Sequence, residues 1–431
     1  MDARPRRRAL LHHRPAQTLR SRTVGVARQR WVDRVLGQPL CWGASRLARR
    51  GRPEPAAGDV RRILIVVLSE MGALVLTGPM FERLKQKYPS ATIYVLCSDQ
   101  NIAALDLMDV VDAEHVITVR IGSLGALATD TVRAVRRMRA IAFDAVLDLE
   151  LFARVSAVLA ALSGAPIRVG FHRFTQEGLY RGDAINRPVL YNPHQHIAEQ
   201  FVTLADAIGS TDMPAAKRLL QTAPPRLSPL RLRPGELESA RDALYRRHPS
   251  IAGRPLVFVC PGAGLIPIRA WPIASFAKVA RAFVDRGYAV AIVGTAADRA
   301  LAQTIQRACP GEHCVDLTGY TETVRSIVVL LHLGALLITN DGGTGHMAAL
   351  TPISSIVLFG PETPVLYGSL SPRAINLHKP LSCSPCLTAY NHRQSPCDGN
   401  NVCLQTISPE EVLAAAGALI GDLIGRGQVV G

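Results

Sequence analysis

The sequence predicts an α/β protein built from two doubly wound parallel sheets, and three observations support this fold class. Apolar runs at 61–68 and 256–260 are typical of strands buried on both faces of a parallel sheet. Stretches with helical spacing follow at 74–88 and 273–286, and such alternation implies a parallel sheet covered by helices. A chain of 431 residues, 48% of them hydrophobic, can bury two cores of this kind.

A stretch rich in Pro, Arg and Ser at 206–254 separates the two halves of this pattern. We therefore expect a basic, partly amphipathic arm at 1–59, a first Rossmann-like domain at 60–225, a linker and domain entry at 226–254, and a second Rossmann-like domain at 255–431. The strands expected along the chain are 61–68, 91–96, 145–149, 256–260, 289–294 and 336–339. Ligands of such sheets bind at the carboxyl ends of the strands, which places the expected site in a cleft between the domains.

The formal charge of +15 is concentrated at the start of the chain. Residues 1–62 contain 16 arginines, no lysine and four acidic residues, a balance of +12, so the remaining residues carry only +3. A basic globule would indicate a nucleic-acid binder, but a nearly neutral body with a basic arm does not. We expect no nucleic-acid partner.

The second half of the arm, at 31–50, combines Trp31 and Trp42 with aliphatic side chains and arginines. Trp and Arg together suit the headgroup layer of an anionic membrane, so we expect peripheral contact with the membrane surface. A solvated basic extension is the alternative, and RNA binding is disfavoured because an RNP-like aromatic pattern is absent. The sequence has no apolar run of membrane-spanning length and no apolar signal core, so we expect a cytoplasmic protein associated peripherally with the inner membrane.

The most informative turn follows the strand at 336–339 and runs from Asn340 to His346. A buried strand, a Gly-rich turn and a helix start together direct backbone N–H groups and the positive end of a helix dipole at one place, which suits phosphate. Asp341 can accept hydrogen bonds from hydroxyl groups, so one turn could hold a sugar and a diphosphate. His346 alone would more often be a structural hydrogen-bonding residue than a catalyst.

Two further strand–turn–helix junctions have similar features. After the strand at 61–68, Gly72 allows a close approach to the backbone, and the carboxylate of Glu70 could take a proton from an attacking hydroxyl; the alternative is an exposed turn residue. After the strand at 256–260, Arg269 can pair with phosphate oxygens; the alternative is an ordinary surface arginine. None of the junctions has the dinucleotide fingerprint or the phosphate-loop pattern, which argues against dehydrogenases and NTPases.

The order of these motifs over residues 60–420 resembles that of glycosyltransferase family 9, the ADP-heptose:lipopolysaccharide heptosyltransferases and their relatives. The matching pieces are the Leu-Ser-x-Met-Gly turn at 68–72, Pro-Gly-Ala at 261–263 with Arg-Ala-Trp-Pro at 269–272, Asp-Leu-Thr-Gly-Tyr-Thr at 316–321, the turn at 340–346, and Leu-Phe-Gly-Pro-Glu-Thr-Pro at 358–364. The resemblance implies a GT-B fold, with the acceptor bound by the first domain and the nucleotide sugar by the second.

The resemblance also assigns roles by position. It implies that Asp341 meets the donor sugar, that Gly342, Gly343 and Thr344 bind the diphosphate, and that Arg269 stands where the family has a phosphate-binding lysine. His346 is counted with these donor residues. The family has Met-Gly-Asp in the first turn, with that Asp as the proposed catalytic base, whereas this chain has Ala73.

Alanine cannot take a proton, so either Glu70 supplies the carboxylate from the same turn or the chain is not a heptosyltransferase of the usual kind. We favour Glu70 as the base, with Gly72 and Ala73 as acceptor-side or turn backbone. The expected reaction is a single inverting displacement that moves a heptose or another hexose-type unit from a nucleotide-diphosphate donor to a cell-envelope glycolipid or oligosaccharide of lipopolysaccharide type. The alternative is a non-catalytic or divergent relative that binds nucleotide sugar or glycan and lacks the usual base.

We expect no catalytic metal and no cofactor besides the nucleotide sugar, since the turn and Arg269 could neutralise the leaving diphosphate. Asp148-Leu149-Glu150 superficially resembles a metal-binding Asp-x-Asp, but its place at a strand end favours a structural role.

Nine cysteines, an odd number, argue against a disulfide framework. Four of them cluster, namely Cys383, Cys386, Cys397 and Cys403. They could form a structural zinc site, a redox disulfide or reduced thiols in a loop, and the last is favoured because the spacing of the second pair is loose.

Overall fold

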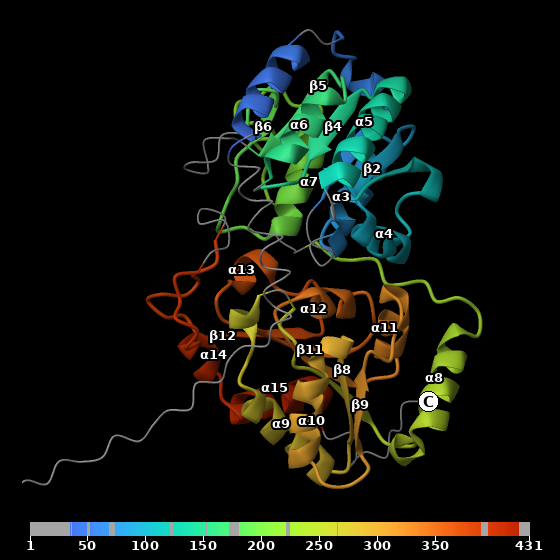
Figure 1. The fold of residues 1–431 in the computed structure, drawn as a ribbon, viewed down its shortest axis with the longest axis vertical. Coiled ribbons are helices and arrows are strands. Elements are labelled where there is room, and N and C mark those ends of the chain that lie inside the picture. Colours follow the sequence, from blue (N-terminus) through green and yellow to red (C-terminus); the bar gives the residue numbers. More distant parts are fainter. Residues whose placement is uncertain are drawn as a thin grey trace, which may run out of the picture.

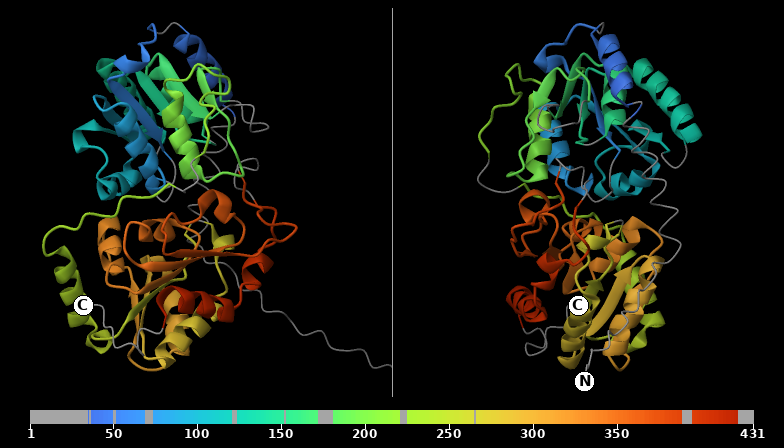
Figure 2. Two further views of the ribbon diagram at one scale, coloured as in Figure 1. Left: turned by 180° about the vertical axis from the view of Figure 1, so that it is seen from behind. Right: turned by 60° about the vertical axis from the view of Figure 1, so that its left-hand side comes forward.

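The computed structural model describes residues 35, 37–49, 52–68, 74–120, 124–151, 153–171, 181–220, 225–264, 266–388 and 395–421. It contains two α/β lobes, one above the other in Figure 1, joined by the chain that leaves α7 and runs down to α8. The two views in Figure 2 show that each lobe has its sheet between layers of helices. None of the helices in these ranges is both long and apolar enough to span a membrane.

The upper sheet consists of six parallel strands in the order β3-β2-β1-β4-β5-β6. Their bounds are β1 Arg62–Val67, β2 Thr92–Ser98, β3 Val116–Val119, β4 Ala145–Asp148, β5 Ile167–Phe171 and β6 Arg187–Val189. The central strand β1 pairs in parallel with β2, where Ile63 is opposite Ile93, and with β4, where Ile63 is opposite Ala145. This is the order of a Rossmann fold, with its switch point between β1 and β4.

The lower sheet repeats the topology in the order β12-β11-β10-β7-β8-β9, again with all strands parallel. Its strands are β7 Leu256–Cys260, β8 Ala289–Gly294, β9 Cys314–Thr318, β10 Leu336–Asn340, β11 Ser354–Phe359 and β12 Ala374–His378. Read from β9, the order again corresponds to a Rossmann fold, and the switch point lies between β7 and β10. The two doubly wound sheets confirm the fold class predicted from the sequence.

Helices connect the strands and cover both sheets (Figure 1). In the upper lobe they are α3 Gly78–Lys87, α4 Ile102–Met108, α5 Leu124–Ile141, α6 Arg154–Leu162 and α7 Ile197–Ala207. In the lower lobe they are α8 Glu236–Arg247, α9 Ile273–Asp285, α10 Arg299–Ala308, α11 Val324–Leu331, α12 Gly343–Ala348, α13 Pro364–Tyr367, α14 Val402–Gln405 and α15 Pro409–Ile420. Helix α8 lies within the segment expected as linker and domain entry, and its Leu244 is buried in the core of the lower sheet. Residues 37–48 form an additional helix on the upper lobe.

The two lobes contact each other at the carboxyl ends of their sheets. An apolar cluster joins Leu107 of α4 to Val328 and Val329 of α11. His196, the N-cap of α7, accepts a hydrogen bond at Nδ1 from Ala198 N, so its proton is on Nε2, which lies 3.0 Å from Gly368 O in the other lobe. These contacts make the strand ends of one sheet face those of the other.

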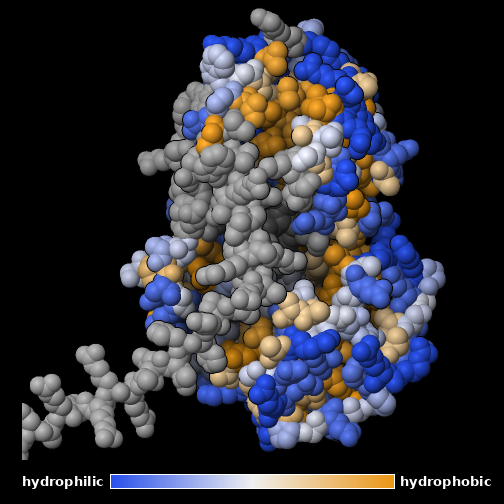
Figure 3. All heavy atoms as spheres, viewed as in Figure 1, coloured by the Kyte–Doolittle hydropathy of each residue, from blue (hydrophilic) through white to orange (hydrophobic). Residues whose placement is uncertain are grey.

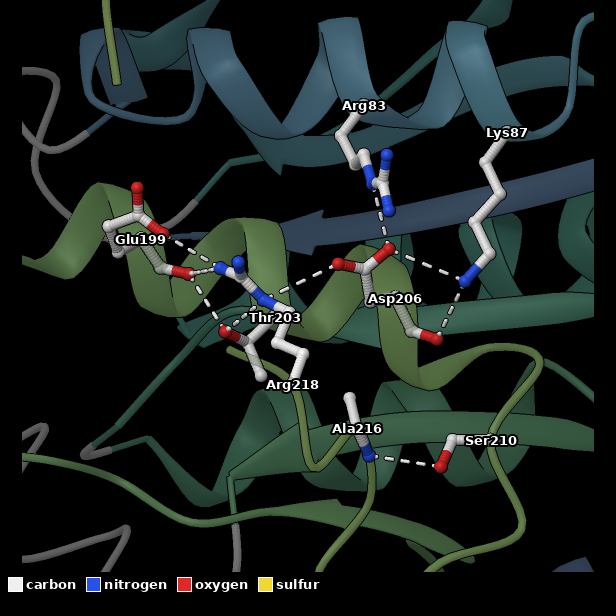
Figure 4. A network of polar contacts seen from close by, with 8 residues as sticks. All are labelled: Arg83, Lys87, Glu199, Thr203, Asp206, Ser210, Ala216 and Arg218. Atoms are coloured by element: carbon white, nitrogen blue, oxygen red, sulfur yellow. Dashed lines mark hydrogen bonds and ion pairs between the residues drawn. The ribbon is translucent and has the colours of Figure 1, made fainter. Parts of the chain in front are cut away.

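An ionic network centred on the buried Asp206 connects helices of the upper lobe (Figure 4). Asp206 of α7, which is 8% exposed, binds Arg83 at 2.8 Å and Lys87 at 3.3 Å, both on α3. Arg218, on the segment that leaves α7, pairs with Glu199 at 2.7 Å and with Asp206 at 3.4 Å. The network therefore ties α3, α7 and the start of the connection between the lobes into one unit.

Asp148 and Glu150 have structural partners, as expected for residues at a strand end. Asp148 is fully buried and pairs with Arg181, whose guanidinium also donates to Ser156 Oγ at 2.9 Å. Glu150 is 4% exposed and accepts a hydrogen bond from Leu68 N at 2.7 Å. Glu150 thus fixes the end of β1 at the point where the first predicted junction begins.

Candidate functional site

A pocket of about 540 Å³ lies at the carboxyl ends of the lower sheet. Segments that follow β7, β8, β9, β10 and β11 all contribute to its walls. It therefore includes the switch point between β7 and β10, where doubly wound sheets bind their ligands. The pocket brings together all six residues expected at the donor site: Arg269, Asp341, Gly342, Gly343, Thr344 and His346.

An ionic cluster forms one wall of this pocket. Arg269 Nε lies 3.4 Å from Asp341 Oδ2, and Arg269 Nη2 lies 2.8 Å from Glu362 Oε1. The side chains of Arg269, Asp341 and Glu362 are only 9%, 5% and 2% exposed. Arg269 is therefore a buried cation between two carboxylates, rather than the ordinary surface arginine that was the alternative from the sequence.

The turn after β10 places Asp341 and the glycines at the pocket floor. Asp341 N donates to Leu358 O at 2.9 Å, which continues the pairing of β10 with β11 beyond the end of β10. Gly345 N and His346 N both donate to Gly342 O, which closes the first turn of α12. The first N–H groups of a helix have no intrahelical acceptor, and here they belong to the Gly-rich turn that lines the pocket.

Asn340 connects this turn with the junction after β7. Its Oδ1 accepts from Trp271 N at 2.9 Å, and its Nδ2 donates to Pro261 O at 2.9 Å. Trp271 is 2% exposed, and its indole Nε1 donates to Ile407 O at 2.9 Å. Trp271 therefore packs the start of α9 into the core, and Asn340 fixes the two glycine turns relative to each other.

Cys260 lines the pocket at the end of β7. Its thiol donates a long hydrogen bond of 3.7 Å to Thr344 Oγ1. Burial raises the pKa of Cys260 above its ordinary value, which keeps the thiol neutral near pH 7. Cys260 is therefore a neutral neighbour of Thr344, which is expected to bind the diphosphate, and it is not a nucleophile.

Asp298 is a pocket residue that the sequence analysis missed. Its Oδ2 accepts hydrogen bonds of 2.8 Å from both Thr295 N and Thr295 Oγ1. A Cβ atom on Gly262 would lie 2.8 Å from Asp298 Oδ1, and one on Gly294 would lie 2.9 Å from Asp298 Oδ2. Two glycines thus allow this carboxylate to lie across the ends of β7 and β8. The Thr-x-x-Asp capping box at 295–298 was the available signal.

Glu362 was also missed as a site residue, although it lies in the motif at 358–364. The sequence feature that could have identified Glu362 is its position shortly after the apolar run that forms β11. The spacing of 93 positions between Arg269 and Glu362 gave no reason to pair them.

The residues expected on the acceptor side, Glu70, Gly72 and Ala73, lie outside the described residues. The four clustered cysteines are described and carry free thiols, two of them exposed, at Cys383 and Cys397. Burial is the main cause that raises the pKa of Cys403, with further contributions from the other three cysteines. Across the described ranges no group of three or more His, Cys, Asp or Glu side chains is placed to hold a metal ion, so the geometry gives the zinc alternative no support.

Two facing doubly wound domains, with a pocket at the switch point of the second, form the GT-B architecture. The sequence profile described as glycosyltransferase family 9 (heptosyltransferase) matches residues 131–395, which is more than half of the chain. The chain belongs to glycosyltransferase family 9, which confirms the resemblance found in its motifs, and it is a transferase.

Individual relatives agree with this assignment. The chain is 27% identical over 368 residues to lipopolysaccharide heptosyltransferase 2 of Salmonella typhimurium, which covers 84% of this chain and 99% of the relative. It is 25% identical over 324 residues to lipooligosaccharide heptosyltransferase 2 of Haemophilus ducreyi, and the match covers 73% of this chain and 87% of the relative.

Solved structures show the same architecture. The E. coli ADP-heptose lipopolysaccharide heptosyltransferase II superposes with a TM-score of 0.65 at 25% identity, over 83% of this chain and 98% of that one. A family 9 glycosyltransferase from Veillonella parvula gives a TM-score of 0.64 at 22% identity, over 84% and 98%, and supports the fold alone.

Proposed function

We propose that this enzyme transfers a heptose, or another hexose-type sugar, from a nucleoside-diphosphate donor to a cell-envelope glycolipid of lipopolysaccharide type. One observation carries the proposal: the six residues expected at the donor site line a single pocket at the switch point of the second sheet. ADP-heptose is the first donor to test, because the similar E. coli enzyme is an ADP-heptose transferase and the similar curated proteins are heptosyltransferases.

The pocket suggests how the donor is held. Asp341 accepts hydrogen bonds from sugar hydroxyls, and the N–H groups of Gly342, Gly343 and Thr344 contact the diphosphate. Arg269 and its two carboxylate partners carry a net charge of −1 when all three are ionised, so this cluster alone does not attract an anion. We assign Arg269 two tasks that a planar guanidinium can combine: it holds Asp341 in place through one edge and meets a phosphate oxygen through another.

The proposed reaction is a single displacement with inversion. A base takes the proton of the acceptor hydroxyl, the hydroxyl oxygen forms a bond to the anomeric carbon, and the bond from that carbon to the diphosphate oxygen breaks. The nucleoside diphosphate leaves with the electron pair of the broken bond. Hydrogen-bond donors already aimed at this oxygen stabilise the charge that develops there. We propose Glu70 as the base, since Ala73 stands where the family has an aspartate.

A second candidate function rests on the same alanine. Without the usual base, the chain could bind a nucleotide sugar or a glycan without turning it over. Release of nucleoside diphosphate from a panel of nucleotide sugars, in the presence of a lipid-A-based acceptor, separates the two functions. Turnover that is lost in Glu70→Gln supports transfer with Glu70 as the base. Binding without turnover of any donor would overturn the enzyme assignment, whereas full activity of Glu70→Gln would overturn only the base.

The proposed glycolipid acceptor also indicates where in the cell the enzyme works. A glycolipid acceptor is held in a bilayer, and the arm at 1–59 is basic, so we propose that the enzyme works at the cytoplasmic face of the inner membrane without spanning it. Sedimentation with anionic liposomes tests this proposal. Deletion of residues 1–58 is expected to reduce sedimentation, and undiminished sedimentation would remove the membrane role of the arm.

A further inference from the structure

The helix at 37–48 is fixed to the upper lobe by a stripe of small side chains. Its buried positions follow helical spacing and are Gly37, Cys41, Ala44, Ser45 and Ala48. Ala44 and Ala48 pack against Ala161 of α6 and Ala184. Because small residues face the domain, the helix lies close to it, and its large side chains have to point elsewhere.

Hydrogen bonds set the orientation of this helix. Ser45 Oγ donates to Cys41 O at 2.6 Å and accepts from Asp183 N at 2.8 Å. Gly182 has a φ of +86°, and a Cβ atom there would lie 2.5 Å from Ser45 Oγ. The contact is too close for any other residue at 182, so the outward face of the helix is as well defined as its inward face.

The outward face is apolar to an unusual degree. Eleven large hydrophobic side chains are exposed in the described parts of the chain, and four of them belong to this short helical stretch: Val35, Leu40, Trp42 and Leu47. They are 47% to 56% exposed. Figure 3 shows apolar side chains gathered at the upper end of the molecule, where this helix lies in Figure 1. Exposed apolar groups that gather on one element mark an interaction surface.

The sequence of this helix and of the segment before it is strongly basic. Residues 34–53 contain five arginines and no acidic residue, and residues 1–34 contain ten arginines against two aspartates. Arg46 lies over the ring of Trp42, with its guanidinium carbon 3.4 Å from the ring centroid. A Trp ring with a guanidinium stacked on it suits the headgroup layer of an anionic bilayer, where apolar and anionic groups meet.

We propose that the outward face of the helix at 37–48 is a docking surface for an anionic phospholipid bilayer, in which Leu40, Trp42 and Leu47 enter the headgroup layer. This inference rests on the proposed function and deepens it by naming the surface that contacts the membrane. The helix is fixed to the first domain, which is the domain expected to bind the acceptor. Docking through this face therefore places the acceptor domain against the membrane that contains the acceptor.

The test compares full-length variants by co-sedimentation with vesicles of phosphatidylcholine alone or mixed with phosphatidylglycerol. Trp42→Glu/Leu47→Glu keeps the buried stripe and places two negative charges on the outward face. Leu190→Glu is the matched control, because Leu190 is 55% exposed on the same lobe and follows β6 rather than belonging to this helix. We expect the double variant to bind phosphatidylglycerol vesicles at least roughly tenfold more weakly than the wild type and the control. High salt is expected to weaken wild-type binding as well.

Further measurements decide between the outcomes. Equal binding of the double variant and the Leu190→Glu control would overturn the proposal. So would a dimer that dissociates in the double variant while vesicle binding is unchanged, because the face would then bind a second copy of the chain. A water-soluble, deacylated acceptor separates this proposal from the transferase: the double variant is expected to act on it as the wild type does. If the wild type shows no transfer but its vesicle binding depends on this face, only the proposed function fails.

Discussion

Replacing Arg269 with methionine tests the ionic cluster of the pocket directly. The substitution keeps much of the side-chain volume and removes the guanidinium that pairs with both Asp341 and Glu362. These carboxylates are 5% and 2% exposed, so water cannot easily replace the guanidinium. Removing one partner of a buried ion pair costs about 3–5 kcal/mol. Since domains are stable by only about 5–15 kcal/mol, the loss is a large part of the total.

Urea unfolding monitored by tryptophan fluorescence measures this cost. The chain has three tryptophans, so a Trp31→Phe/Trp42→Phe background leaves Trp271, two positions from Arg269, as the only reporter. Arg281→Met is the matched control, because Arg281 pairs with Asp285 on the surface, where the two side chains are 45% and 53% exposed. Such exposed pairs contribute about 0–1 kcal/mol.

A second substitution distinguishes loss of charge balance from loss of packing. Glu362→Gln neutralises one of the two carboxylates that pair with Arg269. The double variant is therefore expected to lose less stability than the sum of the losses of the two single variants, by about 0.5–3 kcal/mol, the usual range of coupling between residues in contact. If Arg269→Met is as stable as Arg281→Met, or if the two effects simply add, the cluster does not hold the pocket wall as described.

The remaining predictions concern contacts that connect the turns and the lobes. Asn340→Ala removes the hydrogen bonds to Trp271 N and Pro261 O. We expect the free energy of unfolding in urea to fall by about 1–3 kcal/mol and donor binding to weaken. Unchanged donor binding would show that the turns do not need this connection. Burial lowers the pKa of His196, so between that value and 6.5 the unfolded chain binds more protons, and stability falls as the pH drops below 6.5. His196→Gln should flatten this pH dependence of the urea midpoint, and an identical slope would contradict it. Gly182→Ala should displace the helix at 37–48 and weaken vesicle sedimentation while soluble-acceptor activity is retained; a variant with wild-type sedimentation would count against the close contact at Ser45.

Most of the fold could be predicted because local patterns determine it. The run at 289–294 forms β8 with the predicted bounds, and the runs at 256–260 and 336–339 form β7 and most of β10. Parallel strands buried on both faces are apolar throughout, so they are visible in the sequence. The shared direction of these strands then brings their turns to one edge, which is why six expected donor residues meet in one pocket.

The pairing within the pocket could not be predicted, because it depends on the order of strands in the sheet. Glu362 follows β11 and Arg269 precedes α9, and these segments meet only because β11, β10 and β7 are neighbours. Asp298 was missed for a related reason, since its place depends on glycines that end two adjacent strands. On the arm, the sequence indicated an amphipathic segment, but only packing shows that its small residues face the domain and its large ones face outward.

The most direct test of the account is donor turnover by the wild type and Asp341→Asn. The measurement is acceptor-dependent release of nucleoside diphosphate, with Asp285→Asn as a control because Asp285 is a half-exposed carboxylate that does not line the pocket. We expect the wild type and Asp285→Asn to turn over one nucleotide sugar, ADP-heptose first among those tested, and Asp341→Asn to lose about 10²-fold in kcat/KM. Equal kcat/KM for Asp341→Asn and Asp285→Asn would contradict the claim that this pocket is the donor site.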